Sequence, residues 1–188
     1  MRRSLWKPLG MTQCGFGPVP QGQDGEPKNP WPHAAAGPNR TDPVPVPWDT
    51  DNPSALGPAG TVHCTIASYA RFLQLHLDAM LGCCHSRLLP HDAFRVLHTP
   101  YRLLTNAATL GGTGDVYTPG AWLFREENID DGWGKHLLHD GSNTVNYAWA
   151  IVAPKRQAAF FTGTNVGEAS RAMSEVASGL LNGTLGLE

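Results

Sequence analysis

Proline is concentrated in one stretch of this chain, and this concentration constrains the fold more than any other sequence feature. Eleven of the 16 prolines lie between Pro18 and Pro58. Proline lacks the amide hydrogen on which helices and central strands depend, so long helices and central strands are excluded from this stretch. Trp31 and Trp48 also lie there, although flexible linkers usually lack such large side chains. We predict that residues 15–62 form a long ordered loop region packed on the surface, with a flexible linker as the alternative.

A helical pattern begins after residue 64. Apolar residues recur there at spacings of three and four, which is typical of an amphipathic helix. These residues are Ile66, Tyr69, Ala70, Phe72, Leu73, Leu77 and Leu81. Thr65 suits the N-cap and Gly82 suits the C-terminal end, so we expect a helix over residues 66–81. Pro90 suits the first position of a second, short helix that ends near His98.

Strand patterns fill most of the remaining chain, after a loop-like segment over residues 101–120. Residues 121–125 and 135–139 flank one turn-rich segment, and residues 146–153 and 157–164 flank a hairpin turn at Pro154-Lys-Arg156. A last amphipathic pattern covers residues 168–181, with Gly183 as its terminator. Consecutive hairpins imply an antiparallel sheet. The sequence therefore predicts an α+β fold, in which an antiparallel sheet packs against a C-terminal helix and is preceded by other helices.

The composition limits the classes of partner. The 188 residues suit a single domain, with 41% hydrophobic and 16% charged residues and a net charge of −2. No long basic run is present, so nucleic acid and anionic membranes are not expected partners. No apolar stretch reaches the roughly 18 residues of a membrane span. The first eight residues lack the apolar region of a secretory signal, so the chain as it stands is expected to be cytoplasmic, although the sequence does not fix the compartment.

Four cysteines are present at positions 14, 64, 83 and 84. Adjacent cysteines such as Cys83 and Cys84 rarely bond each other, and no C-x-x-C sequence occurs. We therefore expect buried or free thiols, which are compatible with a reducing compartment. Zinc ligands are usually spaced by two to four residues, so no metal site is predicted, and no cofactor is expected.

The sequence His139-Asp140-Gly141-Ser142 carries the strongest chemical signal. A strand-like run ends at His139, Gly141 frees the backbone, and a long apolar strand follows. This arrangement can place a hydrogen-bond donor and a backbone N–H at a reaction centre. A local triad of His139, Asp140 and Ser142 is geometrically poor, because side chains three residues apart on a strand point to opposite faces. Without further context, His139 would be interpreted as a strand-end histidine bonded to the backbone.

Three segments together resemble the serine β-lactamase, penicillin-binding protein and esterase superfamily. Residues 5–12 (LWKPLGMT) resemble its (F/W)-x-P-L-G-M segment, and residues 51–60 (DNPSALGPAG) resemble the entry to a late helix. His139-Asp140-Gly141 resembles its third motif, which is K-T-G, or H-x-G in esterase-like members. The resemblance covers nearly the whole chain but only the later part of the family's sequence. It implies that residues 1–188 are one β-lactamase-like domain, incomplete at its N-terminal side.

The resemblance also implies roles for individual residues. The family's nucleophile is a serine in S-x-x-K, assisted by a tyrosine in Y-x-N. By resemblance, His139 would donate a proton or hydrogen bond, and Gly141 would let substrate approach the backbone. The N–H of Ser142 would be an oxyanion donor. Asn143 and Asn146 would bind substrate, a small-molecule ester or amide.

The expected nucleophile motifs are the main departure from the family pattern. No Y-x-N or S-x-N sequence is present. One S-x-x-K occurs, Ser4-Leu-Trp-Lys7, but the catalytic version opens a helix that continues past the lysine. Pro8 follows Lys7 at once and disfavours helix there. We interpret this occurrence as chance.

Three hypotheses follow for function. The chain is the later portion of a serine hydrolase that acts on ester or amide bonds, β-lactam-like ones included, through an acyl-enzyme and depends on a complementing chain. Alternatively, it is a non-catalytic binding or scaffolding module that keeps the pocket strand. In the third, Ser142 or Cys64 is an atypical nucleophile. Truncation would leave residues 157–164 as an open apolar edge and expose part of the face with Leu180 and Leu181, which favours homo-oligomers, strand exchange or low stability.

Overall fold

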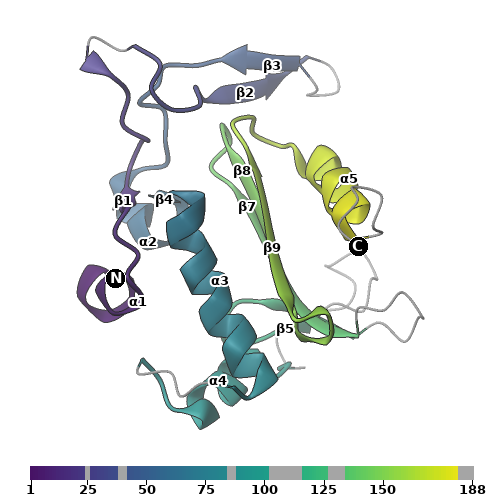
Figure 1. Ribbon diagram of the computed structural model, residues 1–188. Helices are drawn as coiled ribbons and strands as arrows, with labels where there is room; N and C mark the ends of the chain where they lie inside the picture. Colours follow the sequence, from purple (N-terminus) through teal and green to yellow (C-terminus); the bar gives the residue numbers. More distant parts are fainter. Residues whose placement is uncertain (24–25, 38–41, 84–87, 102–115, 127–133, 182–188) are drawn as a thin grey trace. The chain divides into compact units, whose positions relative to one another are not determined.

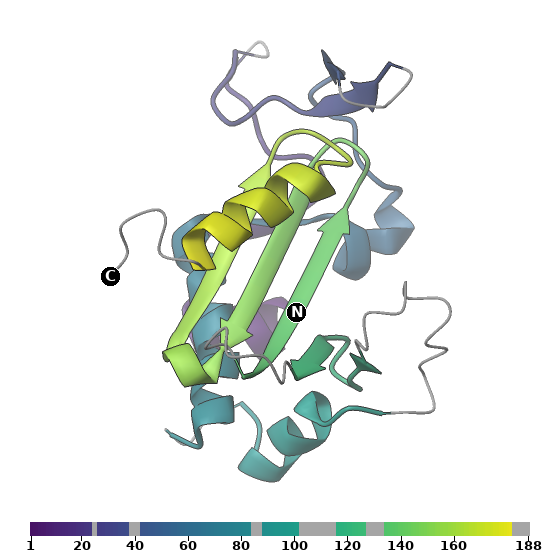
Figure 2. The same ribbon diagram turned by 90° about the vertical axis from the view of Figure 1, so that its right-hand side faces the viewer.

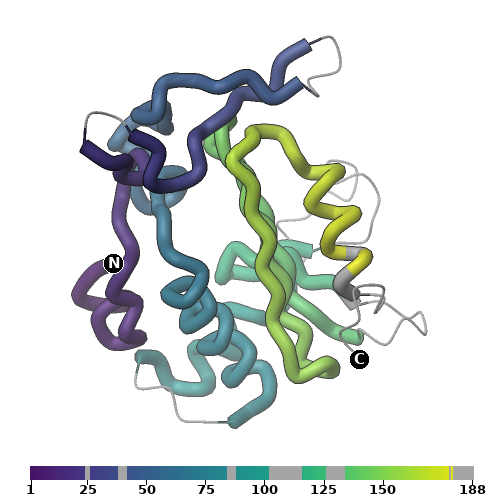
Figure 3. Tube along the Cα trace, turned by 45° about the horizontal axis from the view of Figure 1, so that its top comes forward, coloured from purple at the N-terminus to yellow at the C-terminus, as the bar shows by residue number. Residues whose placement is uncertain are grey.

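The computed structural model describes residues 1–23, 26–37, 42–83, 88–101, 116–126 and 134–181, nearly all of which are coloured in Figure 3. The chain divides into two compact units, and each is described by itself. The first unit consists of Met1–Gln13, Thr65–His139 and Ala150–Phe161. The second consists of Cys14–Cys64, Asp140–Trp149 and Thr162–Glu188.

The strands that follow residue 115 form a five-stranded sheet in the order β5-β6-β7-β8-β9 (Figure 2). Its strands are β5 (Val116–Tyr117), β6 (Leu123–Glu126), β7 (Lys135–Ser142), β8 (Tyr147–Ala153) and β9 (Ala158–Thr164). β6 and β7 pair antiparallel, as expected. β5 also pairs antiparallel with β6, so the expectation of a loop over residues 101–120 is wrong at Val116 and Tyr117. The expected strand end at His139 is wrong, because β7 runs on through Ser142. β9 is a terminal strand of this sheet among the described residues.

The first unit contains two helices that the sequence predicts closely, α3 (Ile66–Leu81) and α4 (His91–His98) (Figure 1). Thr65 Oγ1 accepts a hydrogen bond from the Ser68 N–H at 3.4 Å, and Gly82 ends α3 in the left-handed conformation. Both predicted ends are confirmed. The apolar pattern is wrong at the helix termini, because Ile66 and Leu81 are exposed by 73% and 39%.

The core of the first unit lies between α3 and the sheet. Buried side chains of α3 pack against Trp122 and against the neighbouring strands β7 and β8. This cluster contains Leu73, Leu77, Trp122, Leu137, Ala150 and Val152. Fully burying one leucine side chain stabilises a fold by about 2 kcal/mol, so this cluster fixes the sheet against α3. The chain enters the unit through a short π-helical turn, η1 (Arg2–Trp6), and α1 (Lys7–Leu9), and η5 (Pro154–Arg156) joins β8 to β9.

The second unit contains the proline-rich stretch, whose described parts form two small antiparallel pairs. β1 (Cys14–Phe16) pairs with β4 (Val62–Cys64), and β2 (His33–Ala36) pairs with β3 (Asp42–Pro45). β3 accommodates Pro43 and Pro45 because its sheet has only two strands. The short helices η3 (Ser54–Leu56) and α2 (Gly57–Gly60) follow, and α5 (Ser170–Leu181) is the C-terminal helix. Gly183 and the side chains of Leu180 and Leu181 lie outside the described residues.

A disulfide joins Cys14 and Cys64, which are direct partners in the β1–β4 register. The expectation that all four cysteines are thiols is therefore wrong for this pair. The two residues are 50 positions apart, and only the strand register brings them together. Disulfides persist in oxidising compartments, so Cys14 and Cys64 do not indicate a reducing compartment. Cys83 is exposed and keeps its thiol.

None of the helices in the described part of the chain is long and apolar enough to cross a lipid bilayer.

Candidate functional site

β7 changes character along its length. His136, Leu137 and Leu138 are buried, whereas His139 to Ser142 are exposed. Alternation along a strand places His139 on the same face as Leu137, which belongs to the core under α3. Gly141 follows on that face. The exposed half of β7 therefore carries His139 and Gly141 on the same strand face that packs into the core at Leu137.

His139 belongs to the first unit, where it contacts Trp122. The two ring centroids are 6.2 Å apart and the rings meet edge-on at 65°. Trp122 is 4% exposed and sits just before β6, whose Leu123 pairs with Leu138 of β7. The imidazole of His139 therefore packs against one aromatic ring, although the residue as a whole is exposed.

Gly141 and Ser142 belong to the second unit. A Cβ atom built on Gly141 would meet no atom of the described residues within 4 Å. The Ser142 hydroxyl donates to the Asn146 carbonyl oxygen at 2.8 Å and accepts from the Thr144 N–H at 2.9 Å. The strand is open to approach at Gly141, and the Ser142 side chain helps to build the turn that follows.

Asn143 also builds this turn. Its Oδ1 accepts hydrogen bonds from the N–H of Asn146 at 2.8 Å and from the N–H of Val145 at 3.3 Å. Its Nδ2 donates to Asp51 Oδ1 at 2.9 Å, which links the turn to the proline-rich stretch. These bonds occupy both ends of the Asn143 amide, and the substrate-binding role assigned to Asn143 and Asn146 stays a prediction.

The hypothesis that Cys64 is a nucleophile is wrong, because its sulfur is bonded to Cys14 and carries no thiol. Ser142 has no base among its hydrogen-bond partners, which are both backbone groups. Ser4 and Lys7 are both exposed. The expectation that Pro8 prevents helix at Lys7 is wrong, because proline is tolerated in the first turn of α1. That helix ends at Gly10, so it does not provide the continuing helix of a catalytic S-x-x-K.

A hydrogen bond between Tyr147 and Asp140 was not anticipated from the sequence. The phenol of Tyr147, at the start of β8, donates to a carboxylate oxygen of Asp140 in β7. Burial, together with this hydrogen bond and the charge of Asp140, raises the pKa of Tyr147. Asp140 is therefore engaged by Tyr147, and the tyrosine stays protonated. The signal in the sequence was the placement of the two residues on either side of a short turn.

Two buried histidines form a second unexpected pair, in the first unit. His76 Nδ1 lies 2.8 Å from His98 Nε2, so one ring nitrogen donates and the other accepts. Burial lowers the pKa of His76 to about 3, with a further contribution from His98, and burial lowers the pKa of His98 to about 4. Both rings are neutral at pH 7. The position of His76 between Leu73 and Leu77 on the apolar stripe could have indicated its burial.

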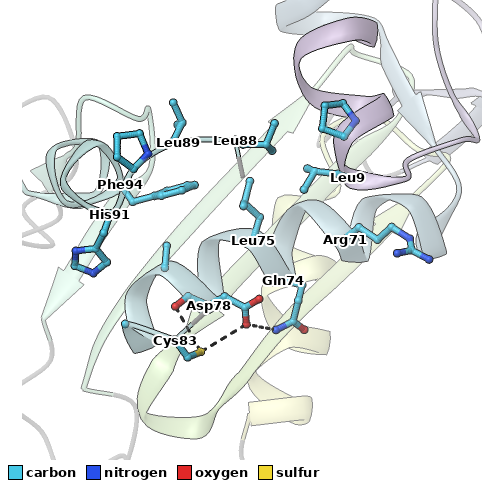
Figure 4. Close-up of a pocket in the computed structure, with 14 residues that line it drawn as sticks. Leu9, Arg71, Gln74, Leu75, Asp78, Cys83, Leu88, Leu89, His91 and Phe94 are labelled. Carbon is cyan, nitrogen blue, oxygen red and sulfur yellow. Dashed lines mark hydrogen bonds between the residues drawn. The ribbon is translucent and has the colours of Figure 1, made fainter. Parts of the chain in front are cut away.

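A cavity of about 650 Å³ lies elsewhere in the first unit, against α1, α3 and α4 (Figure 4). Apolar side chains such as Leu75 and Phe94 line it, together with Asp78 and Cys83. Asp78 Oδ1 accepts a hydrogen bond from Gln74 Nε2 at 2.6 Å, and the Cys83 sulfur lies 3.9 Å from the same oxygen. No residue from His139 to Asn146 lines this cavity. Among the described residues, no group of three or more potential ligands is placed to hold a metal ion.

The sequence matches the model of the Beta-lactamase family over residues 1–178. No curated protein matches the chain in sequence.

Solved structures with similar folds include an octameric penicillin-binding protein homologue from Pyrococcus abyssi, with a TM-score of 0.63 and 15% identity over 97% of this chain and 36% of that one. A D-stereospecific amidohydrolase from Streptomyces sp. has a TM-score of 0.62 and 17% identity, over 92% and 45% of the two chains. A penicillin-binding protein from Bacillus halodurans has a TM-score of 0.58 and 14% identity, over 94% and 47%. At these identities the likeness shows the fold, and the chain spans less than half the length of each of these structures.

Proposed function

The chain belongs to the β-lactamase family, and from this premise we propose that it supplies one edge of a serine hydrolase active site. The substrate class is a small ester or amide, β-lactam-like bonds included, cleaved through an acyl-enzyme. The observation that carries the proposal is the exposed half of β7, where His139 and Gly141 follow a buried stretch on one strand face. In this proposal the nucleophile lies outside residues 1–188, and a complementing chain is one source of it.

Each residue of the edge has a chemical role in the proposal. His139 donates a proton or hydrogen bond to the reacting group. Gly141 leaves the backbone open, because no described atom lies within 4 Å of its missing side chain. The N–H of Ser142 is one oxyanion donor, and a donor of this kind contributes about 3–4 kcal/mol to transition-state stabilisation. Asn143 and Asn146 contact the substrate from the turn.

A nucleophile from outside residues 1–188 is supported by two observations. No described serine hydroxyl is hydrogen-bonded to a lysine or histidine side chain, which is the pairing that activates a serine nucleophile. β9 ends the described sheet and offers an edge for a further strand. Pairing of this edge with a second copy of the chain would give a homo-oligomer, which brings no new nucleophile; one structure with a similar fold is an octamer.

A non-catalytic binding module is the alternative function. The turn after β7 favours it, because the side chains of Ser142 and Asn143 are occupied by hydrogen bonds within the protein. Such a module would bind a planar ester and a tetrahedral anion with similar affinity. An oxyanion edge would prefer the tetrahedral anion, because its donors are placed for the charge of the transition state.

Binding of two matched ligands separates these functions. The chain is titrated with a phosphonate monoester anion and with the planar carboxylic ester of the same side group, and amide resonances are followed by NMR. We expect the phosphonate to bind more tightly, with the largest shifts at Gly141 and Ser142, and the H139F variant to reduce the preference. Equal affinities would support the module, and shifts confined to the α3–α4 cavity would refute both functions.

Labelling with a fluorophosphonate tests the missing nucleophile. The chain alone should give no serine adduct by intact mass and peptide mapping. An adduct on any serine of this chain would overturn the proposal that the nucleophile lies outside residues 1–188, and it would identify the nucleophile directly.

A further inference from the structure

We propose that Trp122 is the positioning residue for His139, and that the buried His76–His98 pair fixes Trp122 in turn. The inference rests on the proposed function, because it concerns the orientation of the imidazole that faces the substrate there. Its structural part concerns only the first unit. All the residues involved lie between Thr65 and His139.

Among the described residues, the indole of Trp122 is the only aromatic ring in contact with the imidazole of His139. An exposed histidine on a strand samples several side-chain rotamers, and a large buried neighbour on one side excludes some of them. Trp122 is almost fully buried, whereas His139 is exposed. The contact therefore restricts the mobile ring and leaves its other side accessible to a ligand.

The backbone of Trp122 is held by a tight turn. The Trp122 carbonyl accepts a hydrogen bond from the Thr118 N–H at 2.8 Å, and its own N–H donates to Thr118 Oγ1 at 3.3 Å. The Gly120 N–H donates to the Leu97 carbonyl at 3.0 Å, which ties the turn to the end of α4. A side chain at Gly120 would approach the Leu97 oxygen to 2.7 Å, so the two segments fit closely only with glycine there. The backbone of α4 thus sets the position of the indole.

The histidine pair links α4 to α3 directly behind the indole. The His76 ring lies 5.0 Å from the Trp122 ring at 67°, and His98 is the last residue of α4. The 2.8 Å hydrogen bond between the rings joins the helix that holds the turn to the helix that packs under the indole. Phe72 completes the support by stacking on Trp122 with 6.3 Å between centroids.

Continuous packing therefore runs from the buried pair through Trp122 to His139. Two contacts hold the same indole from different elements: the turn that is hydrogen-bonded to α4, and the ring of Phe72 in α3, which stacks on Trp122. Because both histidines are neutral when buried, the support is retained over the neutral pH range. Neither the pair nor Trp122 has to contact a substrate for this role, so they are positioning residues.

The test is NMR on the full chain with labelled histidine and tryptophan. The His139 imidazole signal is assigned from its loss in H139Q. We expect cross-relaxation between the indole and imidazole protons in the unmodified chain, and a displaced His139 signal in W122L because the ring current is removed. The W122F variant keeps a smaller ring and should restore part of the shift.

The W48L variant is the matched control, because Trp48 is 40% exposed and belongs to the second unit. It should leave the His139 signal unchanged. Absence of the indole–imidazole cross-peak in the unmodified chain would overturn the inference, as would an unmoved His139 signal in folded W122L. If W122L does not fold, the cross-peak and W122F decide. None of these readouts needs ligand, so a positive result with no phosphonate binding would refute the proposed function alone.

Discussion

Removing the Cys14–Cys64 disulfide should lower the free energy of unfolding by about 4 kcal/mol. The bond closes a loop between residues 50 positions apart. In the chain-entropy account, closing a loop of that length removes roughly 14 cal/mol/K from the unfolded state, which corresponds to about 4 kcal/mol at 25 °C. The closed loop contains the proline-rich stretch, whose described strands and helices are all short. The bond therefore restricts a segment with little regular secondary structure.

The perturbation is the double variant C14S/C64S, compared with the oxidised chain by urea unfolding without reductant. Both proteins carry C83S, because the exposed Cys83 thiol could otherwise exchange with the bond. Serine is close to cysteine in size, so little of the loss should come from packing. The change should appear as a lower midpoint with a steeper slope, because the unfolded variant lacks the cross-link and exposes more surface.

Two results would refute this reasoning. A loss below about 1 kcal/mol would show that loop closure does not dominate the contribution of the bond. Unbonded Cys14 and Cys64 thiols in the oxidised protein, detected by alkylation and peptide mapping, would show that the register pairs the strands without the bond. Reduction of the unmodified chain should reproduce the behaviour of the double variant.

Three further predictions follow from the structure. The pKa of His76 is lowered to about 3 from 6.5 in the unfolded chain, so its contribution to stability is complete above pH 6.5 and falls as the pH drops towards 3. At pH 5.5 this residue should account for a loss of about 1.4 kcal/mol in the free energy of unfolding, measured by comparing urea unfolding of the unmodified chain and of H76L. Equal dependence of the unfolding free energy on pH in the two proteins would refute this prediction. Gly167→Ala should cost about 3 kcal/mol, because the added Cβ would overlap the Thr144 carbonyl, whereas Gly57→Ala, whose nearest atom is 3.9 Å away, should cost far less in the same thermal-melt comparison. Gly141→Ala should leave the melting temperature unchanged yet weaken phosphonate binding, and unchanged binding would argue against approach to the backbone there.

Local features were the predictable part of the fold. Thr65 and Gly82 determine the ends of α3 through hydrogen bonds and backbone conformation within a few residues. The hairpin at Pro154-Lys-Arg156 is equally local. The end of β7 was misplaced because Asp140, Gly141 and Ser142 are not typical strand residues, and pairing with neighbouring strands overrides that preference.

Long-range features were not predictable. The disulfide depends on the register of β1 and β4, and that register cannot be derived from the spacing of the cysteines in the sequence. The His76–His98 pair depends on the packing of α3 against α4, which are separated by residues 82–90. For the candidate site, the resemblance predicts roles for His139 and Gly141, and these roles stay predictions. The sequence could not show that Trp122 lies against the histidine.

Hydrogen bonds from the proline-rich stretch to the turn after β7 limit where this protein can be re-engineered. His33 donates its N–H to the Val145 carbonyl at 3.2 Å, and Asp51 accepts from Asn143. A stretch rich in proline and glycine would ordinarily be chosen for inserting a tag or shortening a loop. Here an insertion or deletion near His33 or Asp51 would loosen the turn beside Gly141, so the tolerance of this stretch to length change should be lowest at those two positions.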